Sequence, residues 1–72
     1  HPKDADLLLA LGRICRHMGF LGKAKDYLKS TIVISPSATA YAELAEVLAL
    51  LGDSASSSEI YRQGLLASVQ AK

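Results

Sequence analysis

The sequence contains no tryptophan, one phenylalanine, two prolines and one cysteine in 72 residues. A single cysteine excludes a domain held together by internal disulfides. No apolar run approaches the roughly 18 residues that suggest a membrane span. The net charge of +1 excludes a nucleic-acid binder that relies on bulk positive charge. We therefore expect no nucleic-acid partner, and no membrane contact by this segment.

The first residues of the chain bear on whether it belongs to a longer protein. It opens with His1-Pro2 instead of methionine, and no signal-peptide pattern follows. We expect a segment cut from a longer protein, so these residues alone leave its localisation open.

What is present is a helical pattern. Hydrophobic residues, mostly alanine and leucine, make up 50% of the chain, which favours helices over strands. Apolar periodicity and cap residues predict helices over about 4–18, 21–35, 37–51 and 53–69. The stretch 31–34 is rich in β-branched residues, but no other segment could pair with it, so we assign it to the second helix. Because the connections are short, successive helices must be antiparallel neighbours. We therefore expect an all-α fold of four antiparallel helices. The expected core stripe of the first helix is Leu7, Leu8, Leu11, Ile14, Cys15 and Met18.

The helices repeat along the chain. Gly19 recurs as Gly52. The difference between these two residue numbers, here called the repeat offset, also separates Leu11 from Leu44 and relates several small residues to one another. A helix pair that recurs after about 33–34 residues is typical of tetratricopeptide repeats. The first copy matches the family's spacing with Leu8-x-x-Leu11-Gly12-x-x-Cys15, Ala24-x-x-x-Leu28 and Pro36. The chain thus resembles a tetratricopeptide (TPR) domain. The resemblance implies an α-α superhelix in a single domain over 1–72, with repeat 1 at about 5–37 and repeat 2 at about 38–70.

A closer resemblance rests on longer segments. Residues 41–45, 51–53 and 61–65, together with 7–12 and 22–24, resemble the C-terminal repeats of the bacterial HemY family. HemY proteins are membrane-anchored tetratricopeptide proteins associated with late steps of protoheme synthesis. The resemblance implies a link to heme biosynthesis and to the bacterial inner membrane. It supplies no catalytic residue.

Residues that could carry chemistry are few and scattered. Cys15, His17 and Met18 are close in sequence, but a helix places His17 about 100° or more from each of the other two. The serines at 54–58 have no accompanying base, and we interpret them as a polar helix start that lowers helix propensity there. The carboxylates are spread over all four helices. We expect no enzyme, no metal site and no cofactor.

The leading functional prediction is a scaffold that binds a protein or peptide. In tetratricopeptide proteins the first helix of each pair lines the concave surface. Carried over, this predicts partner-binding residues Asp6, Leu9, Arg13, Arg16 and His17 in repeat 1, and Thr39, Ala42, Glu46, Ala49 and Leu50 in repeat 2. The family's carboxylate clamp, which uses lysine and asparagine, is absent: Leu9, Arg13, Ala42 and Glu46 stand at those positions. Chaperone-type capture of peptide C-termini is therefore not expected.

The two halves of the chain differ in charge, and two alternative functions stay open. Residues 1–36 carry a balance of +3 and residues 37–72 a balance of −2, and equivalent positions place Arg13 beside Glu46. The same face could instead bind a tetrapyrrole, with Arg13 and Arg16 pairing with its propionates. The segment could also be a purely structural cap of a longer helical array.

Overall fold

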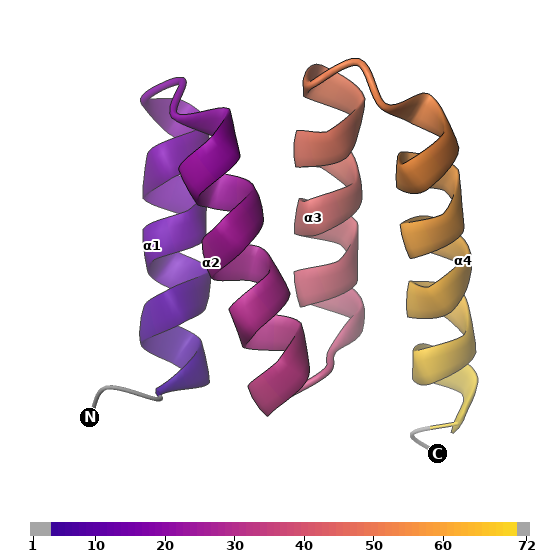
Figure 1. The fold of residues 1–72 in the computed structure, drawn as a ribbon. Coiled ribbons are helices and arrows are strands. Elements are labelled where there is room, and N and C mark those ends of the chain that lie inside the picture. Colours follow the sequence, from indigo (N-terminus) through magenta and orange to yellow (C-terminus); the bar gives the residue numbers. More distant parts are fainter. Residues whose placement is uncertain (1–3, 71–72) are drawn as a thin grey trace.

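The fold is all-α, as predicted. The computed structural model describes residues 4–70, with helices α1 (Ala5–His17), α2 (Leu21–Ile34), α3 (Ala38–Leu50) and α4 (Ser54–Gln70). No strand occurs in this range, and residues 31–34 are helical. The helices lie side by side in chain order and alternate in direction (Figure 1). They form a flat array of 34 × 33 × 14 Å.

The helix boundaries follow the repeat offset. The first and last residues of α3 stand at this offset from those of α1 (Ala5 to Ala38, His17 to Leu50), and α4 begins at the same offset from α2 (Leu21 to Ser54). The caps are related in the same way. Asp4 Oδ1 accepts hydrogen bonds from the first turn of α1, and Ser37 Oγ accepts one from the first turn of α3. A short polar side chain on extended backbone is the usual N-cap. Both helices therefore begin at the same kind of cap residue.

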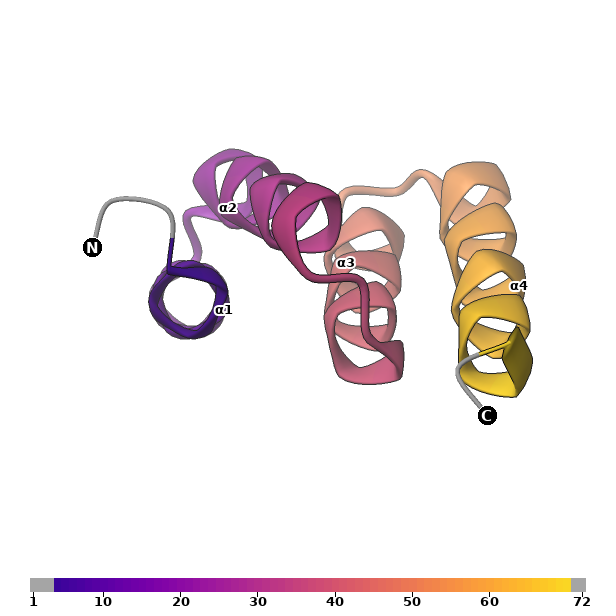
Figure 2. The ribbon, with the colours of Figure 1, turned by 90° about the horizontal axis from the view of Figure 1, so that it is seen from below.

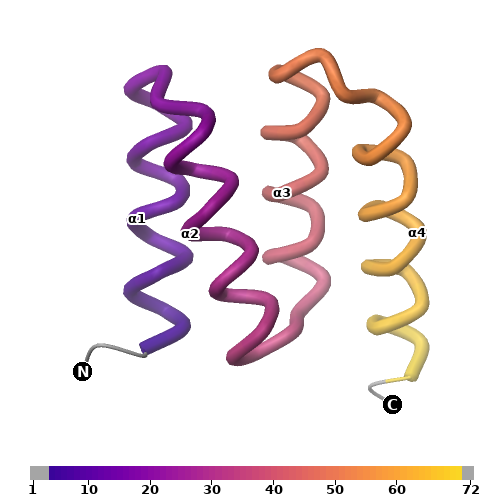
Figure 3. The backbone as a smooth tube through the Cα atoms, in the orientation of Figure 1, coloured from indigo at the N-terminus to yellow at the C-terminus, as the bar shows by residue number. Residues whose placement is uncertain are grey.

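The turns inside the two helix pairs are also equivalent. Gly19 and Gly52 have φ of 85° and 86°, a region that glycine enters without strain. The Phe20 N–H donates to the Cys15 carbonyl at 2.8 Å, and the Asp53 N–H donates to the Leu48 carbonyl at 2.9 Å. These bonds satisfy carbonyl groups left free at the helix ends. Both turns lie at the same end of the array (Figure 3).

α2 and α3 are the two inner helices of the array. α2 contacts α1 on one side and α3 on the other, α3 also contacts α4, and α1 and α3 meet at few positions. Viewed from below, α2 lies away from the line that joins α1 and α3 (Figure 2). The buried core joins Ala24 and Leu28 of α2 to Leu44, Val47 and Leu48 of α3. The two helix pairs therefore share one core.

Small residues let the helices of each pair approach closely. Gly12 of α1 lies against Leu28, and Gly64 of α4 lies against Tyr41. Ser57 of α4 is buried, and its Oγ donates to the Ala45 carbonyl of α3 at 2.7 Å. The interpretation of the serine run as only a polar helix start is therefore wrong for Ser57, which bonds α4 to α3.

The predicted core stripe of α1 is only half buried. Leu8, Leu11 and Cys15 are partly buried, but Leu7, Ile14 and Met18 are exposed. The most buried position of α1 is Gly12, and partly buried Leu9 packs against the shared core. The reason is that α1 has neighbours on one side alone within the part of the chain that is described. Its remaining apolar side chains face outward.

The start of α4 depends on an ionised cap. Asp53 Oδ1 accepts a hydrogen bond from the Ser56 N–H at 3.1 Å. Hydrogen bonds from Ser56, first its side chain and then its backbone, lower the pKa of Asp53, with a smaller contribution from the Lys25 charge.

This cap predicts a pH effect. A lowered pKa in the folded state means that the ionised cap stabilises the fold above the ordinary value of 3.8, and that this contribution is lost as the pH falls through the folded pKa. Asparagine also caps helices but does not titrate. We expect the difference in melting temperature between the wild type and Asp53→Asn to shrink below about pH 3.8. Melting curves followed by circular dichroism between pH 7 and 2.5 would measure it, and a constant difference would contradict the role of the charge.

Candidate functional site: a charged cluster between α1 and α3

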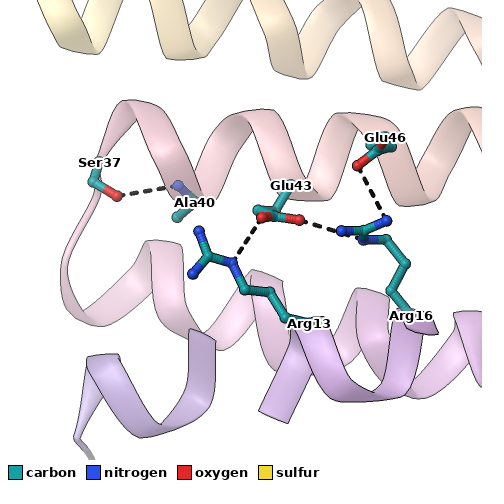
Figure 4. Close-up of polar contacts among 6 residues, drawn as sticks. All are labelled: Arg13, Arg16, Ser37, Ala40, Glu43 and Glu46. Carbon is teal, nitrogen blue, oxygen red and sulfur yellow. Dashed lines mark hydrogen bonds and ion pairs between the residues drawn. The ribbon is translucent and has the colours of Figure 1, made fainter. Parts of the chain in front are cut away.

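Four charged side chains connect the first helices of the two pairs. Arg13 and Arg16 lie one turn apart on α1, and Glu43 and Glu46 lie one turn apart on α3. Arg13 Nε is 2.7 Å from Glu43 Oε2, Arg16 Nε is 3.4 Å from Glu43 Oε1, and Arg16 Nη1 is 3.4 Å from Glu46 Oε1 (Figure 4). This charged cluster bridges two helices that otherwise have few contacts.

The inner and outer members of the charged cluster differ in burial. The Glu43 side chain is 15% exposed and that of Arg16 is 21% exposed, whereas Arg13 and Glu46 are about half exposed. Arg16 Nε and Glu43 Oε1 are buried, and neither makes a hydrogen bond of good geometry with the described residues. Their attraction is therefore a charge interaction in a partly dry environment, where screening by water is weaker. The exposed groups of Arg13 and Glu46 are open to a partner.

The predicted neighbour of Arg13 is wrong by one helical turn. Equivalent positions place Arg13 beside Glu46, but Arg13 bonds to Glu43, and Glu46 pairs with Arg16. Side chains on a helix lean toward its N-terminus, so a long arginine covers the turn before its own Cα. α1 and α3 run in the same direction (Figure 1), so this lean brings Arg13 to Glu43.

Sequence reasoning missed Glu43 as a site residue. The signal was present: two arginines three residues apart on one first helix, and two glutamates three residues apart on the next. Residues with that spacing share a helix face. The complementary doublets indicate that these two helix faces attract each other, but not which arginine meets which glutamate.

The other predicted partner-binding residues are mostly on the surface. Exposed positions are Asp6, His17, Thr39, Ala42, Ala49 and Leu50, while Leu9 is partly buried and packs against the core. Their role in binding stays a prediction, and Leu9 offers the least surface to a partner. Of the predicted residues, the structure brings together Arg13, Arg16 and Glu46 around Glu43.

Metal-type clusters and membrane-spanning helices are both absent from the described residues. Residues 4–70 hold no group of three or more histidine, cysteine, aspartate or glutamate side chains arranged for a metal ion. Within the same range, no helix combines the length and the apolar character needed to cross a membrane. Cys15 packs against the core, whereas His17 and Met18 are exposed. His1 lies outside the described residues.

Comparisons of this chain with protein-family models, with curated proteins and with solved structures find no match. Membership of the tetratricopeptide and HemY families therefore stays a prediction. The function has to be argued from the repeat geometry and the charged cluster.

Proposed function

We propose that this chain is a non-catalytic protein-interaction module of the tetratricopeptide type, and that its partner binds across α1 and α3 at the charged cluster. The observation that carries the proposal is the cluster itself. It spans the first helix of both pairs and leaves one cation, Arg13, and one anion, Glu46, about half exposed. Small exposed side chains at Ala42 and Ala49 lie on the same helix as Glu46 and leave room for a partner.

The repeat geometry supports the tetratricopeptide assignment. The bounds of α1 and α3, their N-caps and the hydrogen bonds of the two turns recur at the repeat offset. Arrays of this kind have a period of about 33–34 residues, which agrees with that offset. The segment resemblance extends the proposal to the C-terminal part of a HemY-like protein that is associated with heme biosynthesis and with the bacterial inner membrane. In that setting the module acts as a scaffold for another protein.

The charges specify the partner's chemistry. A segment with a carboxylate near Arg13 and an ammonium or guanidinium near Glu46 would add pairs to both exposed members without removing the inner Arg16–Glu43 contact. Pairs of this kind contribute mostly to association rate and orientation. We expect a mixed-charge protein segment and a strong dependence of its association on salt.

The tetrapyrrole alternative is less favoured by the geometry. Both guanidiniums interact with Glu43, so propionates would have to compete with a partly buried carboxylate for them. Titration with heme and its precursors tests this directly. Saturable one-site binding that is lost in Arg13→Ala and Arg16→Ala would favour the tetrapyrrole over a protein partner.

A charge swap separates partner binding from folding. The variant Arg13→Glu, Arg16→Glu, Glu43→Arg, Glu46→Arg keeps the net charge and restores opposite charges at each contact, but inverts the pattern seen by a partner. The swap restores an ion pair at every contact, including the partly buried Arg16–Glu43 contact. We therefore expect the variant to remain folded, as a melting curve followed by circular dichroism would verify. We expect at least a tenfold loss of partner binding at low salt.

The measurement is quantitative affinity capture with the wild type, the charge swap and Lys23→Glu, followed by titration of the purified captured protein. Lys23 lies on the exposed surface of α2, away from the charged cluster. A genuine partner is retained by Lys23→Glu and lost by the swap, with a smaller difference at high salt. Equal retention by all three proteins at low salt would refute the charged cluster as the binding site and favour the structural cap.

A further inference from the structure

A groove lies between α2 and α4, with α3 as its floor. α2 and α4 lie on either side of α3 (Figure 2), and within residues 4–70 their backbones make no contact with each other. Two adjoining hollows of ≈ 260 Å³ and ≈ 250 Å³ occupy the space between them. Lys29 of α2, Leu44 of α3 and Ile60 of α4 line both hollows. The two hollows together are here called the α2–α4 groove.

Both walls and the floor of the α2–α4 groove belong to this chain, so its shape does not depend on a neighbouring repeat. The repeat offset shows which surfaces such repeats would use. Lys29 of the α2 wall corresponds to Arg62 of α4, and Ile60 of the α4 wall corresponds to Tyr27 of α2. Arg62 and Tyr27 line neither hollow. A following or preceding repeat stacked in the same way would pack on the sides of those two residues and leave the groove open.

The lining of the α2–α4 groove is largely apolar. Its apolar members come from all three helices: Ile32, Val33, Tyr41, Leu44, Leu48 and Ile60. Val33, at the edge of the groove, is 82% exposed. Each hollow is smaller than the roughly 300–1,000 Å³ of a typical small-molecule pocket. The hollows therefore suit individual apolar side chains of a larger partner.

The two sides of the groove carry opposite charges. Lys25 and Lys29 lie one turn apart on α2, and Asp53 and Glu59 lie on the α4 side. Both carboxylates are already engaged, because Asp53 accepts the capping hydrogen bond of α4 and Glu59 pairs with Arg62. The two lysines form no ion pair with the residues that the structure describes, although the Lys25 charge contributes a little to the lowered pKa of Asp53. The charge that the groove offers to a partner is therefore positive and lies along α2.

We propose that the α2–α4 groove binds an amphipathic helix of another protein, with an apolar stripe and with acidic residues along one side of that stripe. Its apolar side chains enter the two hollows, and carboxylates one turn apart face Lys25 and Lys29. Residues with that spacing share a helix face, and an apolar helix face laid into a groove is a recurrent mode of recognition. No residue of the charged cluster lines the groove. The groove is thus a second partner-binding surface, beyond the proposed function.

A peptide library tests the chemistry of the occupant. The probe is a phage-displayed set of amphipathic helices in which every position beside the apolar stripe is either glutamate or lysine. Selection on the wild type should enrich glutamate along one side of the stripe, and the selected peptide should bind at one saturable site in fluorescence anisotropy. The double variant Lys25→Glu, Lys29→Glu should bind that peptide about tenfold or more weakly, because each reversal turns an attraction into a repulsion. The same variant should select lysine on that side.

The controls separate this groove from general charge attraction and from the charged cluster. Lys23→Glu makes the same charge change on α2 outside the lining of both hollows and should bind the peptide like the wild type, as should the fourfold charge swap. Val33→Ser should weaken binding severalfold without changing the preference for glutamate. Circular dichroism verifies that every variant is helical.

Four results would overturn the proposal. The wild type could select lysine, which indicates a basic occupant, or show no preference between the two residues. The double variant could bind the acidic peptide as tightly as the wild type. Lys23→Glu could weaken binding as much as the double variant does, which indicates attraction to α2 as a whole. Val33→Ser could leave the affinity unchanged, which places the peptide outside the apolar groove.

Discussion

The substitution Leu28→Ala is expected to lower the free energy of unfolding by about 2–5 kcal/mol. Leu28 is fully buried and contacts both neighbours of α2: it lies against Gly12 of α1 and in one cluster with Leu44 and Val47 of α3. Truncation therefore opens a cavity in the core that the two helix pairs share. A chain of this size buries roughly 60% of its unfolded surface and is marginal in stability, so the loss is large enough to remove the cooperative transition.

Leu50→Ala is the matched control, because it removes the same atoms from a leucine that is 57% exposed on α3. We expect it to change the free energy of unfolding by less than about 1 kcal/mol. Urea denaturation followed by circular dichroism at low micromolar concentration compares the two variants. Equal effects of Leu28→Ala and Leu50→Ala would contradict the position of the core.

The second large effect is expected for Gly64→Val, with a loss of about 1–3 kcal/mol. A Cβ at Gly64 would lie 2.7 Å from the Tyr41 Cβ. The Tyr41 Cβ is fixed to the α3 backbone, so no side-chain rotation relieves the overlap, and α3 and α4 must move apart. Separation of these helices also stretches the bond from Ser57 Oγ to the Ala45 carbonyl.

Gly22→Val provides the comparison, since it makes the same change in α2 at a position where a Cβ would meet nothing within 4 Å. We expect its melting temperature to stay near that of the wild type, while Gly64→Val lowers it. Hydrogen exchange adds a local readout: the amides of α4 should lose protection in Gly64→Val before those of α1. If both glycine variants melt alike, the close approach of α3 and α4 does not limit stability.

The four helices and their register follow from local features of the sequence. Asp4 and Ser37 cap α1 and α3, and Gly19 and Gly52 end them, because a cap or a positive φ is a property of one or two residues. The repeat offset is likewise visible in the sequence, since it depends on spacing alone. The doublets of arginine on α1 and glutamate on α3 are visible in the same way, since each depends on spacing within one helix.

Which apolar side chains are buried depends on how the helices pack. Periodicity shows that Leu7, Ile14 and Met18 share one side of α1, but burial requires a neighbouring helix over that side, and none covers it among residues 4–70. The inward position of Ser57 and the partner of Arg13 depend in the same way on the distance and relative height of α3. Local chemistry therefore fixes where each helix begins and ends, whereas contacts between helices fix which of its faces are buried and which side chains they pair.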